Sequence, residues 1–190
     1  EVLKCKNPNC NGKILGKFVH FVSKPAMNIE GLSEATLVKF INKGWLKSFS
    51  DIYKLDKHKD KIIQFEGFGQ KSYEKLWSAI QKSRNVKLNN FLVALGIPLI
   101  GKTAAKTLSE YFDYEWYEIE AALNDGFDFT RLKDFGQTMA DSLMNWYKSE
   151  GYYELDSLMP YLNLVKPQTQ NTTDSLFNGK KIYCTGTFAN

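Results

Sequence analysis

Five glycines are the clearest candidates for binding a ligand in this sequence. Each lies in an apolar stretch that is followed by polar or basic residues. Glycine accepts a positive φ and has no side chain, so a ligand can approach its backbone closely. Amide N–H groups exposed at the start of a helix offer a site for a phosphate oxygen. The five residues are Gly31, Gly67, Gly69, Gly101 and Gly136.

Polar and basic side chains follow these glycines and could reach the same phosphate or its neighbour. With two further residues of the turns, Leu32 and Gly96, they complete a candidate binding set. The set is Gly31, Leu32, Ser33, Gly67, Gly69, Gln70, Lys71, Ser72, Gly96, Gly101, Lys102, Thr103, Gly136, Gln137 and Thr138. Any one of these turns alone is typical of an ordinary connection between helices.

A repeat places these turns in register and favours the phosphate-binding interpretation. We call the last residue of each aligned turn its anchor. The anchors, at positions 33, 69, 101 and 136, recur at intervals of 36, 32 and 35 residues. Apolar residues stand four before, one before and seven after each anchor. They are Ile29, Phe65, Ile97 and Leu132, then Leu32, Phe68, Ile100 and Phe135, then Phe40, Leu76, Leu108 and Leu143. This spacing predicts a helix, an apolar turn and a second helix in each unit.

Charge is distributed unevenly along the chain. The first 112 residues carry 19 basic and 9 acidic side chains (+10), whereas residues 113–160 carry 3 and 11 (−8). Of the 25 basic residues, only Arg84 and Arg131 are arginines. Lysine is a mobile point charge suited to phosphates, while arginine more often reads guanine edges. We therefore expect a polyanionic partner that is bound without regard to its sequence.

Composition excludes several other classes of protein. Hydrophobic residues make up 43% and the mean hydropathy is −0.37, which indicates a globular chain with no membrane partner. Three cysteines do not form a disulfide framework, so we expect a reducing compartment. With two histidines, no Ser-His-Asp set or metalloprotease pattern is present, and we assign no catalytic residue.

The four units resemble helix-hairpin-helix motifs, and together with a cysteine pair they are similar to the C-terminal half of bacterial NAD-dependent DNA ligases. The resemblance covers essentially the whole chain. It rests on Cys5-Lys6-Asn7-Pro8-Asn9-Cys10, on residues 20–32 (HFVSKPAMNIEGL), on residues 65–72 (FEGFGQKS) and on Ala94-Leu95-Gly96-Ile97.

The resemblance implies an all-α fold, a tandem array of four helix-hairpin-helix motifs with a short piece of another domain at each end. Residues 1–24 would be the remnant of a four-cysteine zinc finger with its connector, in which Cys5 and Cys10 form half of a zinc site. Residues 25–165 would be the DNA-binding domain and 166–178 a polar linker. Residues 179–190 resemble the first strand of a truncated BRCT domain, in which Cys184 would be buried.

As for function, the resemblance implies sequence-independent binding of nicked double-stranded DNA within a ligase that seals nicks in replication and repair. The parent enzyme would use NAD and Mg²⁺ in upstream domains and zinc in the intact finger. The chain itself lacks the Lys-x-Asp-Gly motif whose lysine becomes adenylated, so on its own we expect an inactive monomer without cofactors. We expect a cytoplasmic, nucleoid-associated bacterial protein.

Two alternatives remain from the sequence. One is the helix-hairpin-helix scaffold of another DNA-repair protein, and the other is a helical protein-interaction module whose acidic residues 113–160 dock a basic partner. Because the fourth turn lies in that acidic segment, we expect Gly136 to contribute less to DNA binding than Gly69 or Gly101.

Overall fold

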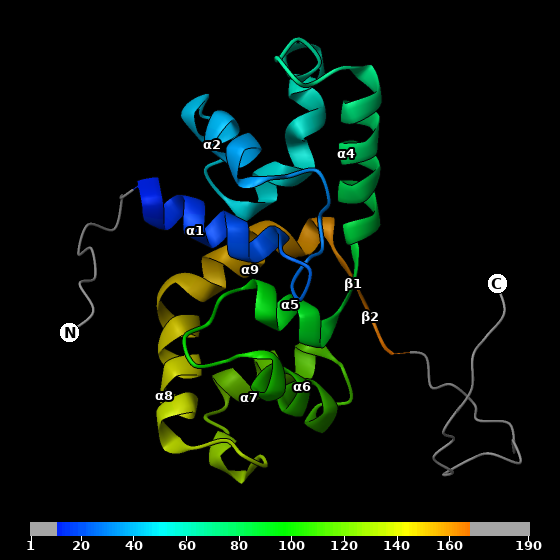
Figure 1. Cartoon of the computed structure of the whole chain (residues 1–190). Coiled ribbons are helices and arrows are strands. Elements are labelled where there is room, and N and C mark those ends of the chain that lie inside the picture. Colours follow the sequence, from blue (N-terminus) through cyan, green and yellow to red (C-terminus); the bar gives the residue numbers. More distant parts are fainter. Residues whose placement is uncertain (1–10, 168–190) are drawn as a thin grey trace, which may run out of the picture.

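Helices form most of residues 11–167, the part of the chain that the computed structural model describes (Figure 1). The α-helices are α1 (Asn11–Val22), α2 (Glu34–Asn42), α3 (Lys59–Ile62), α4 (Gln70–Ser83), α5 (Leu88–Ala94), α6 (Lys102–Tyr111), α7 (Trp116–Asn124), α8 (Gln137–Trp146) and α9 (Tyr152–Leu158). Segments Phe49–His58, Phe129–Arg131 and Met159–Tyr161 are 3-10 helices, and Tyr147–Gly151 is a π-helix. The strands are β1 (Asn85–Lys87) and β2 (Asn163–Val165).

The molecule is elongated, with α2, α3 and α4 at one end, α6, α7 and α8 at the other, and α1, α5 and α9 between them (Figure 1). A single apolar core runs through all three regions. Phe21, Phe40, Phe91 and Phe129 are among its fully buried side chains, one or two from each region. The two halves of the repeat are therefore joined by shared packing.

Helix α1 belongs to this core, although the sequence suggested a connector up to residue 24. Phe18, Phe21 and Val22 are buried at helical spacing, and the helix contacts α2 and α5. The ring of Phe21 stacks on that of Phe49 with centroids 4.1 Å apart. The start of the DNA-binding domain at residue 25 stays a prediction.

The described residues are mostly helical, as expected, and one short parallel sheet adds to the helices. Strands β1 and β2 pair with Asn85 opposite Asn163, and the Asn163 amide donates to the Arg84 carbonyl at 2.7 Å. The Arg84 guanidinium lies over the rings of Tyr53 and Tyr161, 5.2 and 5.7 Å from their centroids. Residues far apart in the chain are thus fixed side by side at the middle of the molecule.

The predicted linker begins where this sheet ends. Its first residue, Lys166, forms ion pairs with Asp113 and Glu115, each at 2.8 Å. These hydrogen bonds raise the pKa of Lys166. Residues 168–178 of the linker, the cysteines Cys5 and Cys10, and the predicted BRCT strand with Cys184 lie outside the described residues.

Two glycines in helical segments predict opposite effects of the same substitution. A Cβ on Gly151 would lie 2.6 Å from the Trp146 ring, whereas one on Gly16 in α1 would meet nothing within 4 Å. We expect Gly151→Ala to lower the free energy of unfolding by about 1–3 kcal/mol through overpacking. Gly16→Ala should raise it by about 0.5–1 kcal/mol because alanine loses less backbone entropy. Urea unfolding measures both free energies. Changes of the same sign in the two variants would contradict the packing of Gly151 against Trp146.

Candidate nucleic-acid interface

Each predicted anchor caps a helix N-terminus. We name the segments turn 1 (29–33), turn 2 (65–69), turn 3 (97–101) and turn 4 (132–136). Their last residues, Ser33, Gly69, Gly101 and Gly136, are the N-caps of α2, α4, α6 and α8. The prediction that a helix starts directly after each anchor is confirmed at all four positions.

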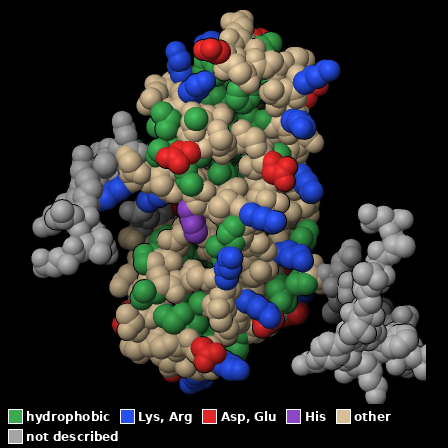
Figure 2. All heavy atoms as spheres, viewed as in Figure 1, with side chains coloured by type: hydrophobic (Ala, Val, Ile, Leu, Met, Phe, Trp, Pro, Cys, Tyr) green, Lys and Arg blue, Asp and Glu red, His purple; other side chains and the backbone are tan. Residues whose placement is uncertain are grey.

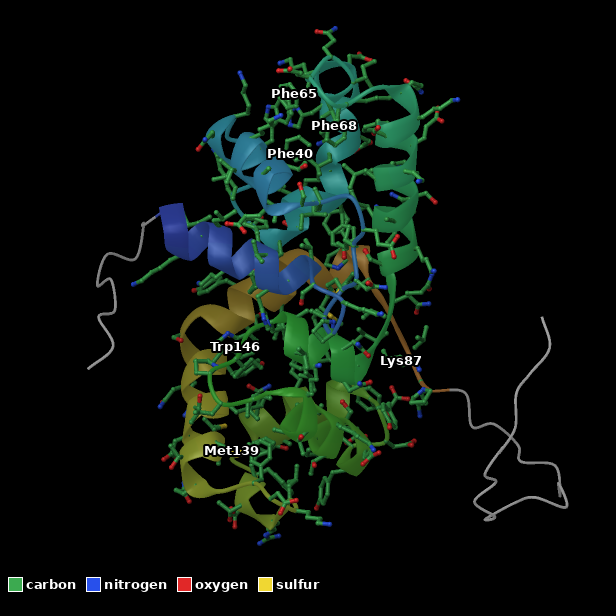
Figure 3. All side chains as sticks on the ribbon, viewed as in Figure 1. Phe40, Phe65, Phe68, Lys87, Met139 and Trp146 are labelled. Carbon is green, nitrogen blue, oxygen red and sulfur yellow. The ribbon has the colours of Figure 1, made fainter. Side chains whose placement is uncertain are left out.

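The apolar residues flanking each anchor hold the turns to the core. Ten of the twelve are buried, and the exceptions, Phe65 and Phe68, are half-buried. These two gather with Phe40 in one aromatic cluster, each with its centroid 6.2 Å from that of Phe40 (Figure 3). In turns 2, 3 and 4 a backbone hydrogen bond joins the first and fourth residues, as from Phe68 N to Phe65 O at 2.8 Å. The turn is therefore clamped at both ends while its middle faces solvent.

The left-handed residue of each turn lies two positions before the anchor. It is Gly31 (φ +94°), Gly67 (+79°), Leu99 (+68°) and Asp134 (+60°). A left-handed conformation costs a residue with a side chain about 1–2 kcal/mol. Turns 3 and 4 have Leu99 and Asp134 instead of glycine at this position, so both turns include this unfavourable term. The alignment of the repeat identifies this position, but the sequence analysis did not single it out.

Glycine at three of the anchors serves a different purpose from the one expected. Gly69, Gly101 and Gly136 have φ of −148°, −88° and −84°, so the expected positive φ is confirmed for Gly31 and Gly67 but is wrong for these three. A Cβ at any of them would meet nothing within 4 Å. Space inside the protein therefore does not require glycine there, and its effect is to leave the backbone bare toward solvent.

The four helix N-termini differ in how they are capped. In turn 1 the Ser33 hydroxyl accepts a hydrogen bond from the Thr36 amide at 3.2 Å. The glycine caps of α4, α6 and α8 make no such side-chain bond. Their first-turn amides lie at the positive end of the helix dipole and can donate to an anion. Turns 2, 3 and 4 are thus better suited to bind a phosphate than turn 1.

Charge favours turn 3 among these. Helix α6 places Lys102 and Lys106 at its first and fifth positions, and both are exposed. The equivalent positions in α4 and α8 hold glutamine–carboxylate pairs, in which Gln70 donates to Glu74 at 2.7 Å and Gln137 donates to Asp141 at 2.8 Å. Carboxylates repel a phosphate backbone, and turn 3 has none at these two positions, although Lys106 itself pairs with Glu110 at 3.6 Å.

Most residues of the candidate set lie at the surface. Leu32 is different: the residue is only 4% exposed and belongs to the core, so its side chain serves packing. Gly69 is half-buried, and the other members are exposed. Gly96, with φ +64°, lies beside α1, where a Cβ would be 3.6 Å from the His20 ring. Gly96 therefore supports the approach of turn 3 to α1.

The turns are spread along the molecule. Turns 2 and 4 lie at opposite ends, with turns 1 and 3 between them (Figure 1). Turn 1 packs on α4, since a Cβ on Gly31 would lie 3.5 Å from Leu76. Turn 3 is fixed by α8, whose Ser142 hydroxyl donates to the Pro98 carbonyl at 2.5 Å. A single surface shared by all four turns stays a prediction.

Other kinds of site find no support among residues 11–167. No group of three or more His, Cys, Asp or Glu side chains there could hold a metal ion. Nε2 of His20 hydrogen-bonds the Val93 carbonyl at 2.6 Å, and the His58 ring stacks on Trp45 with centroids 4.6 Å apart. No described helix is long and apolar enough to span a membrane.

Comparisons with known proteins place these turns in a family context. A family described as "Helix-hairpin-helix motif" matches residues 90–155, which contain turns 3 and 4. A DNA ligase of Ruminiclostridium cellulolyticum is 39% identical over 150 residues, covering 79% of this chain and 22% of the relative. DNA ligases of Persephonella marina and Bacillus subtilis are each 35% identical, covering 99% and 97% of this chain and 26% and 28% of those proteins. The chain thus spans about a quarter of the length of these relatives.

The contrast between serine and glycine caps predicts a pair of stability changes. Ser33→Ala removes the cap of α2 and should lower the free energy of unfolding by about 1 kcal/mol. Gly101→Ser adds a capping hydroxyl in open space and should leave it unchanged or raise it by about 0.3 kcal/mol. Thermal unfolding compares the two variants with the unchanged chain. A clear loss of stability in Gly101→Ser would mean that the fold itself needs glycine at turn 3.

Proposed function

Because the chain belongs to the DNA ligase family, as a homologue of its C-terminal helix-hairpin-helix region, we propose that it binds the backbone of duplex DNA through turns 2, 3 and 4. The first-turn amides of α4, α6 and α8 donate to phosphate oxygens, and Lys71 and Lys102 add positive charge beside them. In this proposal turns 1 and 2 are helix-hairpin-helix motifs like those matched at turns 3 and 4.

The observation that carries this proposal is the set of three glycine N-caps. Serine, aspartate and asparagine are common N-caps because their side chains satisfy the first amides of a helix. At Gly69, Gly101 and Gly136 those amides lack a side-chain cap although space for one exists. An external anion can then fill the place of the cap, as at other helix N-termini that bind phosphate.

Binding of this kind does not read the DNA sequence. Phosphate contacts fix position and orientation but are the same for every base pair. The cations are almost all lysines, which act as point charges, and the exposed Lys102 and Lys106 beside turn 3 are an example. We therefore propose that specificity for a nick comes from other parts of the ligase.

In the whole ligase the chain would hold a nick in place for an active site elsewhere. Such positioning lowers the entropic barrier to phosphodiester formation without any bond chemistry by the chain itself. NAD and Mg²⁺ belong to that upstream chemistry, and the sequence of this chain has no Lys-x-Asp-Gly motif. A zinc site of the intact ligase, of which Cys5 and Cys10 supply half, a monomeric chain, and a cytoplasmic setting in replication and repair are part of the same proposal.

A second candidate function is the docking of a basic protein. In the acidic segment 113–160, Tyr117, Tyr152 and Tyr153 are 61%, 52% and 75% exposed. Tyrosines that keep one face in solvent are frequent at protein interfaces. A basic partner that binds this segment and leaves DNA affinity unchanged would support that function in addition to DNA binding.

DNA binding is tested with the 190-residue chain and a nicked duplex of arbitrary sequence. With about 4 to 6 phosphates neutralised, log K should fall against log salt with a slope of roughly −4 to −5. Gly101→Ser should weaken binding by about tenfold, because its hydroxyl occupies amides that otherwise donate to phosphate. Fluorescence anisotropy at several salt concentrations measures both quantities.

The matched variant is Gly136→Ser in turn 4. Because Gln137 and Asp141 replace the lysines of turn 3, this variant should lose less affinity than Gly101→Ser. Affinity that does not change with salt would reject phosphate binding. Equal losses in the two variants would reject the ranking of the turns.

A further inference from the structure

A hollow of about 280 Å³ lies outside the four turns. The segment 24–28, the end of α4, strand β1 and the start of α5 surround it. We call it the lysine hollow; its lining residues with a charged or amide side chain are Lys24, Lys82, Lys87, Asn28, Asn85 and Asn90. The lysines come from three separate elements, and no aspartate or glutamate lines the hollow.

The backbone around the hollow is held in place by contacts other than the lysines. The side-chain Nδ2 of Asn90 donates to the Pro25 carbonyl at 3.0 Å. Asn28 has a φ of +50°, and its backbone N–H donates to the Ser23 carbonyl at 2.9 Å. Strand β1 is fixed by its pairing with β2. The three lysines are therefore brought together by the fold itself, before any ligand arrives.

Three lysines around one hollow, without a lining carboxylate, give it a positive potential. All three lysines are exposed, so their side chains remain free to turn toward a ligand. The chemistry that fits is a phosphate group, which accepts hydrogen bonds from lysine ammonium and asparagine amide groups alike. Arginine, which would favour planar recognition, is absent from the lining.

The hollow lies between the two ends of the molecule that hold turns 2 and 4. Lys87 marks its level on the edge of the molecule in Figure 3. In Figure 2, lysine and arginine side chains lie along the upper and middle parts of this edge, with a few acidic side chains among them.

We propose that the lysine hollow is a further binding site for backbone phosphates of the duplex, between the two halves of the repeat. This inference rests on the proposed function. It adds contacts from residues outside the four turns, including the far end of α4. The sequence analysis missed them because Lys24 is far along the chain from Lys82 and Lys87, and none of the three belongs to a turn of the repeat.

The test compares two triple variants that change net charge equally. The first is Lys24→Gln, Lys82→Gln and Lys87→Gln; the second, distant from the hollow, is Lys43→Gln, Lys47→Gln and Lys57→Gln, all exposed. Binding of a nicked duplex is measured over a range of salt concentrations. The first variant should make the slope of log K against log salt less steep by about 2 to 3, since each lost phosphate contact contributes about 0.9. The second should leave the slope within about 0.5 of the original.

Thermal unfolding shows that each variant is folded before its affinity is read. An equal change of slope in both variants, or none in the first, would overturn this inference while leaving DNA binding by the turns intact. If the unchanged chain does not bind the duplex, the proposed function fails, and this inference fails with it. The two failures are therefore told apart by the unchanged chain.

Discussion

The structure depends on one backbone reversal, used four times. In each turn two apolar side chains three residues apart pack toward the core. A left-handed residue between them turns the chain, so that the residue two positions after it caps a helix. Burial of the apolar pair supplies the free energy that keeps the reversal in place. Because the pair points inward, the helix N-terminus must point outward. The stability of each turn and the exposure of the first-turn amides of its helix therefore follow from the same apolar contacts.

This constraint explains why the four turns are not equivalent. Turn 1 satisfies its own helix with Ser33, whereas turns 2, 3 and 4 place glycine at that position. Turn 3 combines the bare cap with two lysines and with Leu99, which is left-handed and 59% exposed. Turn 4 carries acidic neighbours instead. The four turns therefore differ in capping and in charge through a few side chains.

The repeat could be predicted from the sequence because its information is local. Spacing of apolar residues gave the helix starts at Ser33, Gly69, Gly101 and Gly136, and burial of the flanking residues agrees with it. Contacts between distant residues could not be predicted in the same way. The pairing of Asn85 with Asn163 involves strands of three residues, too short to show a period. The lysine hollow likewise exists only once residues near 24, 82 and 87 are brought together.

The role of glycine shows where local reasoning fell short. A glycine in a turn suggests a positive φ, and this holds for Gly31 and Gly67 but not for Gly69, Gly101 or Gly136. At the latter three positions neither the backbone conformation nor the packing of the free chain requires glycine. Only the dihedral angles and the open space above each position separate the two reasons.

The central claim is that first-turn amides of α4, α6 and α8 meet the phosphates of a duplex. The most direct measurement is a titration of the ¹⁵N-labelled chain with a short nicked duplex, followed by amide chemical shifts in NMR. The account predicts the largest shifts at Gln70–Ser72, Lys102–Thr103 and Gln137–Thr138, with those of turn 3 changing at the lowest DNA concentration. Shifts confined to α7 and α9, with these amides unchanged, would contradict it.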